Sequence, residues 1–486
     1  MNKIMNVLGI AGVVAVSSFL GTTLFKAGKL KSKQPKPQAR QTVDWDEEKG
    51  LDHFSEALKI KTVSYEQKEQ IQYHEFDRFL GFLERAYPHV HKNLSLEKIN
   101  EYALVYKWKG TDSKSLPIGL ISHYDVVPVP EETIKNWTKD PFSGAVHENI
   151  IWGRGTLDDK IGVIGILEAA EALLKKGFQP TRDLYLMFGF DEEIGGELGA
   201  KSIVEILKKR NIQFDFVLDE GGAIIDGMLP GVDKPVGVIG VSEKGIATVE
   251  LSLEGSGGHA SQPKNQTNIG RISKAIAALE KRQFPARLQE PTTSLLEYAA
   301  PEMTGIMKYI VANQKLFKPI LEKTLVKNPT MAALLRTTIA PTVFLSGEKI
   351  NVLPESATAT INLRLMPGDS LEYVRQFIEE TIQDEEIQVT ISGSEATKVS
   401  DVTGWQFEAI QQATKNIYPE TIVTPYLMFA GSDARYYDQI ADYTFRFLPA
   451  HITSKDLNRI HGTNEQISVE NYHNVVYFYL ELMNRL

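Results

Sequence analysis

Short apolar runs that alternate with a helical stretch are the feature that most constrains this chain of 486 residues. Ile161–Leu174 has the length and spacing of a helix, with Asp158 and Asp159 at its start, where carboxylates suit both capping and the helix dipole. The apolar runs, which predict buried strands, are Leu116–Ser122, Leu184–Phe190 and Phe214–Leu218. Strands separated by helices predict an α/β sheet.

A second pattern begins at about residue 245. The helical periodicity of Leu371–Glu380 lies among runs that alternate with period two, as half-exposed strands do. These runs are Ile246–Leu253, Thr342–Leu345 and Ala357–Leu365. We expect an inserted α+β domain over residues 245–394, with extra helices in the long connection Gln283–Arg336. The main domain would comprise residues 44–244 and 395–486, which resume helix and strand at Trp405 and end in a helix after Ser468.

The N-terminal segment has a different composition from the rest. Ile4–Phe25 carries no charge and is about as long as a helix that crosses a bilayer, which predicts a membrane anchor over residues 1–25. Residues 26–43 form a basic, proline-containing stretch that predicts a solvated linker. The excess of lysines after the apolar run favours a cytoplasmic location for the rest of the chain. Lys3 favours the opposite orientation, so both membrane topologies stay open. The alternative is a cleaved signal peptide and a secreted protein.

Composition narrows the chemistry. A hydrophobic fraction of 42% is enough for a large core, and a net charge of −9 argues against a nucleic-acid partner. The chain has no cysteine, so thiolate metal sites and cysteine nucleophiles are excluded. Any metal must therefore be held by histidines and carboxylates.

Acidic residues and a histidine come directly after the predicted strands. They are His123 and Asp125, then Asp191, Glu192 and Glu193, then Asp219 and Glu220, with Asp158 and Asp159 before the helix. Ligands of α/β sheets bind beyond the carboxyl ends of the strands. Adjacent carboxylates repel unless cations neutralise them, so their occurrence together predicts a pair of divalent metals. The Gly-x-Gly at Gly153 lacks the third glycine of a dinucleotide loop.

Eight segments, in order along the chain, resemble the dinuclear zinc peptidases of the aminoacylase and carboxypeptidase S family. They are Ser122–Asp125, Gly153–Lys160, Asp191–Gly196, Leu218–Gly222, Gly257–Ser261, Asn351–Pro354 with Arg364, Gly431–Arg435 and His461–Glu465. The resemblance is closest to carboxypeptidase S and the N-fatty-acyl-amino-acid synthase/hydrolase branch. It implies an α/β zinc-peptidase catalytic domain, with a mixed sheet flanked by helices, and an inserted α+β lid of the dimerisation type.

The resemblance also implies a metal site for two zinc ions. Asp158 would bridge both ions, and its peptide bond to Asp159 would be cis. The other ligands would be His123 and Asp219 for one ion, and Glu193 and His461 for the second. Glu220 is the alternative to Asp219, and His451 is the alternative to His461.

Further residues take their roles from the same resemblance. Glu192 would be the general base, and Asp125 would orient His123. His259 on the lid would polarise the scissile carbonyl, and in dimeric relatives this histidine comes from the partner subunit. Three residues would bind the substrate, namely Arg364, Asn351 and Arg435.

The function expected from these parts is a zinc hydrolase that cleaves the amide bond of an N-acyl amino acid or small peptide with a free α-carboxylate. The alternatives are a dipeptidase and a non-catalytic binding module on the same fold. The expected partners are the substrate, a membrane through the N-terminal helix, and a second copy of the chain in a homodimer.

Overall fold

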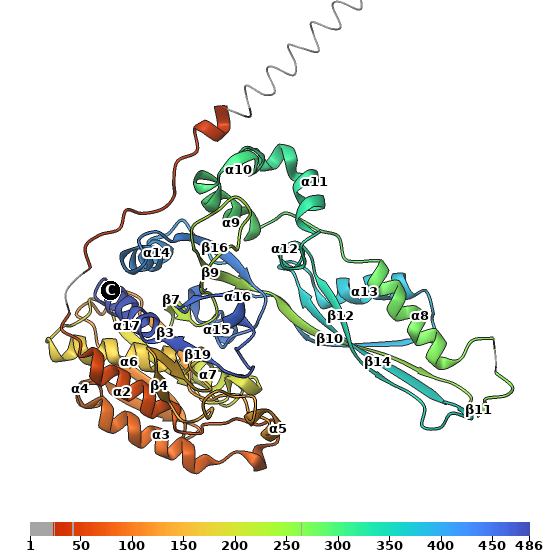
Figure 1. The fold of residues 1–486 in the computed structure, drawn as a ribbon, viewed down its shortest axis with the longest axis horizontal. Helices are drawn as coiled ribbons and strands as arrows, with labels where there is room; N and C mark the ends of the chain where they lie inside the picture. Colours follow the sequence, from red (N-terminus) through yellow and green to blue (C-terminus); the bar gives the residue numbers. More distant parts are fainter. Residues whose placement is uncertain (1–22, 24, 41–42, 264) are drawn as a thin grey trace, which may run out of the picture.

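A computed structural model describes residues 23, 25–40, 43–263 and 265–486 (Figure 1). Its largest element is a ten-stranded mixed sheet, in which nine strands have the order β1-β2-β6-β3-β7-β17-β9-β8-β18 and β16 pairs with β9. The strands are β1 (Ser95–Ile99), β2 (Ala103–Trp108), β3 (Ile118–His123), β6 (Leu184–Gly189), β7 (Phe214–Asp219), β8 (Ile224–Ile225), β9 (Val236–Glu243), β16 (Ile422–Met428), β17 (Ala441–Arg446) and β18 (His451–Ile452). The α/β expectation is confirmed.

The three strands predicted from apolar runs are confirmed and lie at the centre of this sheet. β3 lies between β6 and β7 and pairs with both in parallel. All residues of β3 and β6 are buried, as expected of strands covered on both faces. Because the three strands run in parallel, the polar residues at their carboxyl ends meet at one edge of the sheet.

Helices flank the sheet and bury the main hydrophobic core. The predicted helix is α6 (Lys160–Lys175), which packs against the C-terminal helix α17 (Val469–Met483). The others are α2 (Glu47–Leu58), α3 (Tyr73–Ala86), α4 (Pro88–Asn93), α5 (Glu131–Ile134), α7 (Ala200–Lys209), α14 (Trp405–Ile417), α15 (Ala434–Tyr437) and α16 (Ser454–Leu457). Short 3-10 helices span Lys68–Gln70 and Glu192–Ile194, and a small sheet joins β4 (Ala145–His147), β5 (Ile150–Trp152) and β19 (Gln466–Ser468).

A four-stranded antiparallel sheet projects from the body (Figure 1). We call this sheet and its helices the lid. It comprises β10 (Gly245–Glu254), β12 (Thr338–Leu345), β14 (Ser356–Leu365) and β15 (Gln388–Ser394), with α8 (Asn268–Lys281) and α13 (Leu371–Ile382). Its alternating apolar residues form a separate core with α8 and α13. The short strands β11 (Gly258–His259) and β13 (Val352–Leu353) pair at its far end (Figure 1).

The helices within the predicted connection 283–336 do not extend the lid. They are α9 (Thr292–Ala299), the 3-10 helix Ala300–Glu302, α10 (Gly305–Ala312), α11 (Gln314–Leu325) and α12 (Pro329–Ala333). Their apolar residues form a third core with residues of β9 and β16, such as Val238 and Leu427. This helical insertion therefore packs on the edge of the large sheet, because its apolar side chains meet that sheet and not the lid.

The basic linker lies against the body and does not run free in solvent. The Gln34 side chain exchanges two hydrogen bonds with the backbone of Val423, of 2.9 and 2.8 Å, and the Gln38 N–H donates to Asn416 Oδ1. The predicted anchor falls on residues 1–22 and 24, which lie outside the described residues. Within the described part of the chain, no helix has the length and apolar character needed to cross a bilayer.

Candidate metal centre

The carboxyl ends of β3 and β6 carry a hydrogen-bonded unit centred on Asp125. His123 is the last residue of β3, and its Nδ1 lies 3.3 Å from Asp125 Oδ1. Asp125 also accepts hydrogen bonds from the backbone N–H groups of Glu192 and Glu193, each of 3.2 Å, and from Ser64 Oγ at 2.7 Å. One buried carboxylate thus orients the imidazole of His123 and holds the turn that carries the acidic pair.

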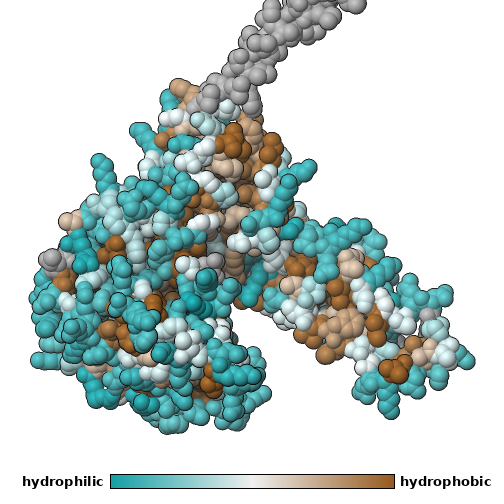
Figure 2. Space-filling view, in the orientation of Figure 1, coloured by the Kyte–Doolittle hydropathy of each residue, from teal (hydrophilic) through white to brown (hydrophobic). Residues whose placement is uncertain are grey.

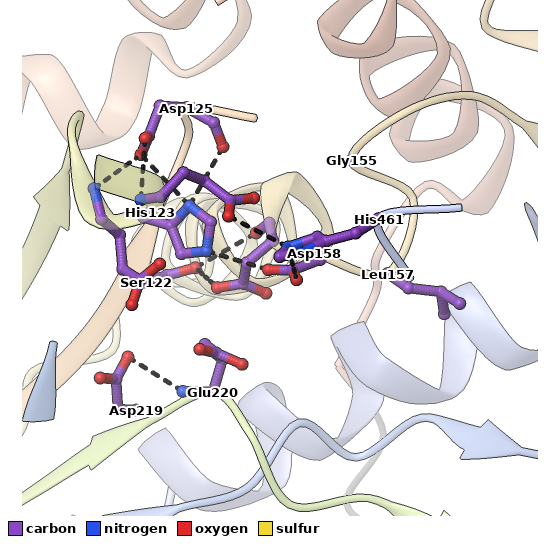
Figure 3. A network of polar contacts seen from close by, with 12 residues as sticks. Ser122, His123, Asp125, Gly155, Leu157, Asp158, Asp219, Glu220 and His461 are labelled. Atoms are coloured by element: carbon purple, nitrogen blue, oxygen red, sulfur yellow. Dashed lines mark hydrogen bonds and ion pairs between the residues drawn. The ribbon is translucent and has the colours of Figure 1, made fainter. Parts of the chain in front are cut away.

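Asp158 lies between two histidines (Figure 3). Its Oδ1 is 3.1 Å from His123 Nε2, and its Oδ2 is 3.0 Å from His461 Nε2. His461 Nε2 is also 3.0 Å from Glu193 Oε2. The peptide bond from Asp158 to Asp159 is cis, as the resemblance implied. The Asp159 carboxylate turns away and accepts a hydrogen bond from Ser122 Oγ.

Two groups of residues could each hold a metal ion, and they share Asp158. The first is His123, Asp158 and Glu220, and the second is Asp158, Glu193 and His461. In each group the potential ligand atoms lie within 4.8 Å of one another. This is the arrangement expected for a bridging carboxylate between two ions.

The structure brings Glu220 into the first group where Asp219 was expected (Figure 3). Asp219 Oδ2 accepts a 2.7 Å hydrogen bond from the Ala434 N–H, and Oδ1 accepts one of 2.9 Å from the Glu220 N–H. Its carboxylate is therefore occupied by backbone donors, and the next residue in the chain reaches the cluster.

His451, the alternative to His461, also lies outside both groups. Its Nε2 is 3.1 Å from Asp226 Oδ1.

A buried ion pair that the sequence did not reveal holds the loops around Asp158 and His461. Arg154 Nη1 lies 2.6 Å from Glu465 Oε2, and both side chains are buried. Glu465 Oε1 accepts hydrogen bonds from the N–H groups of Gly155 and Leu157, of 3.1 and 2.7 Å. Both charged residues lie within motifs of the resemblance, but their pairing joins segments about 310 residues apart.

Electrostatics in the cluster favour a cation. Burial raises the pKa of Glu192 and Glu220 well above their usual range, and nearby carboxylates, with Asp158 among them, raise it further. Burial also raises the pKa of Glu193, whose Oε1 has no hydrogen-bond partner among the described residues. Burial opposes ionisation of Asp158, but hydrogen bonds from His123 and His461 bring its pKa below the usual value. Divalent ions would neutralise this crowded acid cluster, so the residues present fit a metal centre.

The lid residues expected at the site lie elsewhere. His259, in β11, is exposed at the distal end of the lid, where the Ser261 N–H donates to its Nδ1 (Figure 1). Asn351 is exposed beside it, and its carbonyl accepts a hydrogen bond from the Ala260 N–H. The structure therefore does not bring these two residues to the metal cluster.

The two arginines expected to bind substrate differ in their surroundings. Arg364 lies half-buried on β14, and burial lowers the pKa of its guanidinium. It forms no ion pair within the described part of the chain. Arg435 instead donates from Nη2 to the Gly195 carbonyl at 2.9 Å, and the Tyr436 hydroxyl donates to the same oxygen at 2.6 Å. Arg435 therefore holds the turn after Glu193.

Sequence comparisons identify a family and relatives that match most of the chain. The sequence profile of peptidase family M20/M25/M40 matches residues 119–485. The chain is 38% identical over 436 residues to a probable carboxypeptidase S-like protein of Dictyostelium discoideum, which covers 88% of this chain and 83% of that protein. It is 36% identical over 432 residues to an N-fatty-acyl-amino acid synthase/hydrolase of Xenopus tropicalis, which covers 88% of this chain and 84% of that protein.

Solved structures share the fold. An M20 family metallo-carboxypeptidase from Sulfolobus solfataricus superposes with a TM-score of 0.66 at 20% identity, and covers 90% of this chain and 98% of that one. A dipeptidase from Saccharomyces cerevisiae gives a TM-score of 0.61 at 16% identity, with coverages of 90% and 96%. From the profile match and these relatives, the chain belongs to peptidase family M20/M25/M40 and is a metal-dependent hydrolase of that family.

Proposed function

We propose that the chain holds two zinc ions and cleaves the amide bond of an N-acyl amino acid or small peptide that has a free α-carboxylate. The observation that carries this proposal is the pair of histidine and carboxylate groups that share Asp158. His123, Asp158 and Glu220 would hold one ion, and Asp158, Glu193 and His461 the other. Zinc suits this set because histidine nitrogen and carboxylate oxygen are its usual ligands where cysteine is absent.

When bound, the ions would supply an acidified water and a Lewis acid for the scissile carbonyl. We assign the proton transfers to Glu192, which starts the 3-10 helix after β6 and is held through its N–H by Asp125. Glu192 would take the proton of the attacking water and return it to the leaving amine as the carbon–nitrogen bond breaks. Burial raises the pKa of Glu192 above its usual range, which makes this carboxylate a better proton acceptor than an exposed glutamate.

The substrate class rests on Arg364 and on the names of the relatives. Half-buried and without an acidic partner in the described residues, Arg364 is available to a substrate carboxylate, which its planar fork can bind with two hydrogen bonds. The relatives are named for carboxypeptidase S and for synthesis and hydrolysis of N-fatty-acyl amino acids. We propose the same substrate class here, with dipeptides as the alternative.

The test compares one N-acyl amino acid with its carboxamide, in the wild type and in Arg364→Ala. Loss of a charged hydrogen bond of about 2–3 kcal/mol predicts that kcat/KM for the acid falls roughly 30- to 150-fold. The carboxamide should be affected much less. The control is Arg435→Ala, which should affect both substrates equally because Arg435 positions the turn after Glu193. Equal losses on both substrates for Arg364→Ala would show that it does not bind the carboxylate.

We also propose a homodimer formed through the lid. His259 lies at the distal end of the lid, and the edge strand β12 exposes three apolar residues, Val343, Phe344 and Leu345, with exposed fractions of 45, 40 and 65%. An exposed apolar edge strand favours pairing with another chain, which could bring His259 to a neighbouring site. In sedimentation, the wild type should be a dimer and Phe344→Lys a monomer. The monomeric variant should lose activity. A wild type that is monomeric and fully active would contradict this proposal.

The N-terminal anchor over residues 1–25 remains a proposal from the sequence, with secretion after cleavage as the alternative. Sequencing the N-terminus of the protein recovered from its native membranes and medium distinguishes the two.

A further inference from the structure

The helical insertion exposes apolar side chains along α10 and α11. Ile306 is 70% exposed, and Leu316 and Ile320, one turn apart on α11, are 55 and 57% exposed. The opposite side of the insertion is already packed, since Val311, Leu321 and Leu325 are buried in the core shared with β9 and β16. We call the exposed side the α10–α11 surface.

Basic residues surround this surface. Lys315, Lys318, Lys323 and Lys327 are exposed on and after α11, and residues 303–328 contain a single acid, Glu322, in a chain with a net charge of −9. The lysines that border this apolar strip make the surface locally basic on a protein that is acidic as a whole. A locally basic surface indicates an anionic partner.

The described start of the chain, residues 23 and 25–33, places further apolar and basic residues on the same side of the molecule. The Thr23 carbonyl accepts a 3.2 Å hydrogen bond from Asn313 Nδ2, and Lys33 lies 3.2 Å from Glu297 of α9. Phe25 is 61% exposed, and Lys26, Lys29 and Lys31 are exposed. Figure 2 shows apolar residues at this end of the molecule, where residues 26–31 lie beside the end of α10 and the start of α11.

We propose that the α10–α11 surface docks on a lipid bilayer that contains anionic lipids. Apolar side chains such as Leu316 and Ile320 would enter the boundary between headgroups and acyl chains, and the lysines around them would contact phosphates. A second copy of the chain is a poorer occupant. A two-fold contact through this surface would bring the same lysines face to face. This contact through α10 and α11 is distinct from the anchor proposed over residues 1–25.

The absence of cysteine allows a direct test on the full chain. Single cysteines in Leu316→Cys and Ile306→Cys would carry an environment-sensitive fluorophore, and Val146→Cys, 44% exposed on β4 of the body, is the control. On vesicles of phosphatidylcholine with phosphatidylserine, the first two labels should shift to shorter wavelength and be quenched by bromolipids. The label at position 146 should not respond. Vesicle-bound protein whose labels at positions 306 and 316 stay aqueous would overturn the proposal, because binding would then come from another segment.

Charge reversal tests the role of the lysines. Lys315→Glu with Lys323→Glu should weaken binding to vesicles with phosphatidylserine by more than about tenfold. The matched pair Lys92→Glu and Lys109→Glu, exposed on the body, should leave binding unchanged. Activity on a soluble substrate reports that each variant is folded. Equal effects of the two pairs would contradict docking by this surface. So would a label shift that depends on protein concentration without vesicles, which would identify self-association.

Discussion

At the scale of single residues, the chemistry depends on how Asp125 arranges its neighbours. It orients His123 through the imidazole, and it holds Glu192 and Glu193 through their N–H groups. A single carboxylate therefore couples the candidate metal-binding imidazole to the proposed general base. Such supporting carboxylates fix ring orientation and raise ligand basicity.

Glu192→Gln should abolish turnover and keep both metal ions. The amide preserves the shape of the side chain but cannot accept the proton, and loss of a general base typically costs on the order of a hundred- to ten-thousand-fold in rate. Steady-state rates and metal analysis of the same preparation provide the measurement. Wild-type turnover would remove Glu192 from the mechanism, and loss of metal would identify it as a ligand.

The neighbours Asp219 and Glu220 should behave differently on substitution. Glu220→Ala should lose about one metal equivalent, because its carboxylate belongs to the first group. Asp219→Asn should keep both metals but lower the free energy of unfolding by about 1–3 kcal/mol, since one of two N–H donors loses its acceptor. Metal analysis and denaturant unfolding distinguish the two. The reverse pattern would support Asp219 as the ligand.

At the scale of elements, one buried lysine ties the junction between β9 and β10 to the end of the helical insertion. Lys244 is 2% exposed, and its Nζ donates to the carbonyls of Ala333 and Arg336, at 2.9 and 2.8 Å. Burial lowers its pKa from 10.5 to about 7. The unfolded chain therefore holds a proton between about pH 7 and 10.5 that the folded chain has released.

Stability should accordingly rise with pH across that window, because the unfolded state binds more protons there. Lys244→Met removes this contribution. The slope of the free energy of unfolding against pH should fall by up to about 1.4 kcal/mol per pH unit relative to the wild type. Denaturant unfolding at pH 7, 8 and 9 with constant metal measures it. The control is Lys109→Met, an exposed lysine on the body, and an unchanged slope in Lys244→Met would show that Lys244 stays charged when folded.

At the scale of the whole molecule, metal binding and folding should be coupled. The cluster assembles residues from β3, the start of α6, the 3-10 helix after β6, the end of β7 and the loop before β19, so it exists only in the folded chain. A ligand that binds only the folded state stabilises it, by about 2.7 kcal/mol per site at a hundredfold excess over Kd.

Exhaustive chelation should therefore remove activity and lower Tm, and added zinc should restore both. Calorimetry of the chelated and reloaded protein measures the change. Glu220→Ala should show a smaller rise on reloading, since one group is incomplete. Full activity after complete chelation would contradict a metal mechanism.

The sequence by itself determined the part of the site that lies at the ends of strands. His123 and Glu193 were predictable because apolar runs mark strands, and the carboxyl ends of parallel strands meet at one edge of the sheet. The lid strands were predictable for a similar reason, since period-two alternation requires one buried face. Asp158 belonged to the same acidic pattern, but its proposed bridging role and the choice of His461 came only from the resemblance to a family.

Only the tertiary structure shows which of two adjacent acids reaches the metal cluster and where the lid strands and the helical insertion pack. Asp219 and Glu220 are adjacent acids that the sequence could not separate, and the position of the Ala434 N–H determines that Asp219 turns away. His259 lies at the distal end of the lid because β11 pairs with β13 there. The helices after residue 291 pack on β9 and β16. An apolar pattern shows that one face of a helix is buried, but it does not specify what that face packs against. Contacts between residues far apart in the sequence determine where each element packs, and a local sequence pattern carries no information about them.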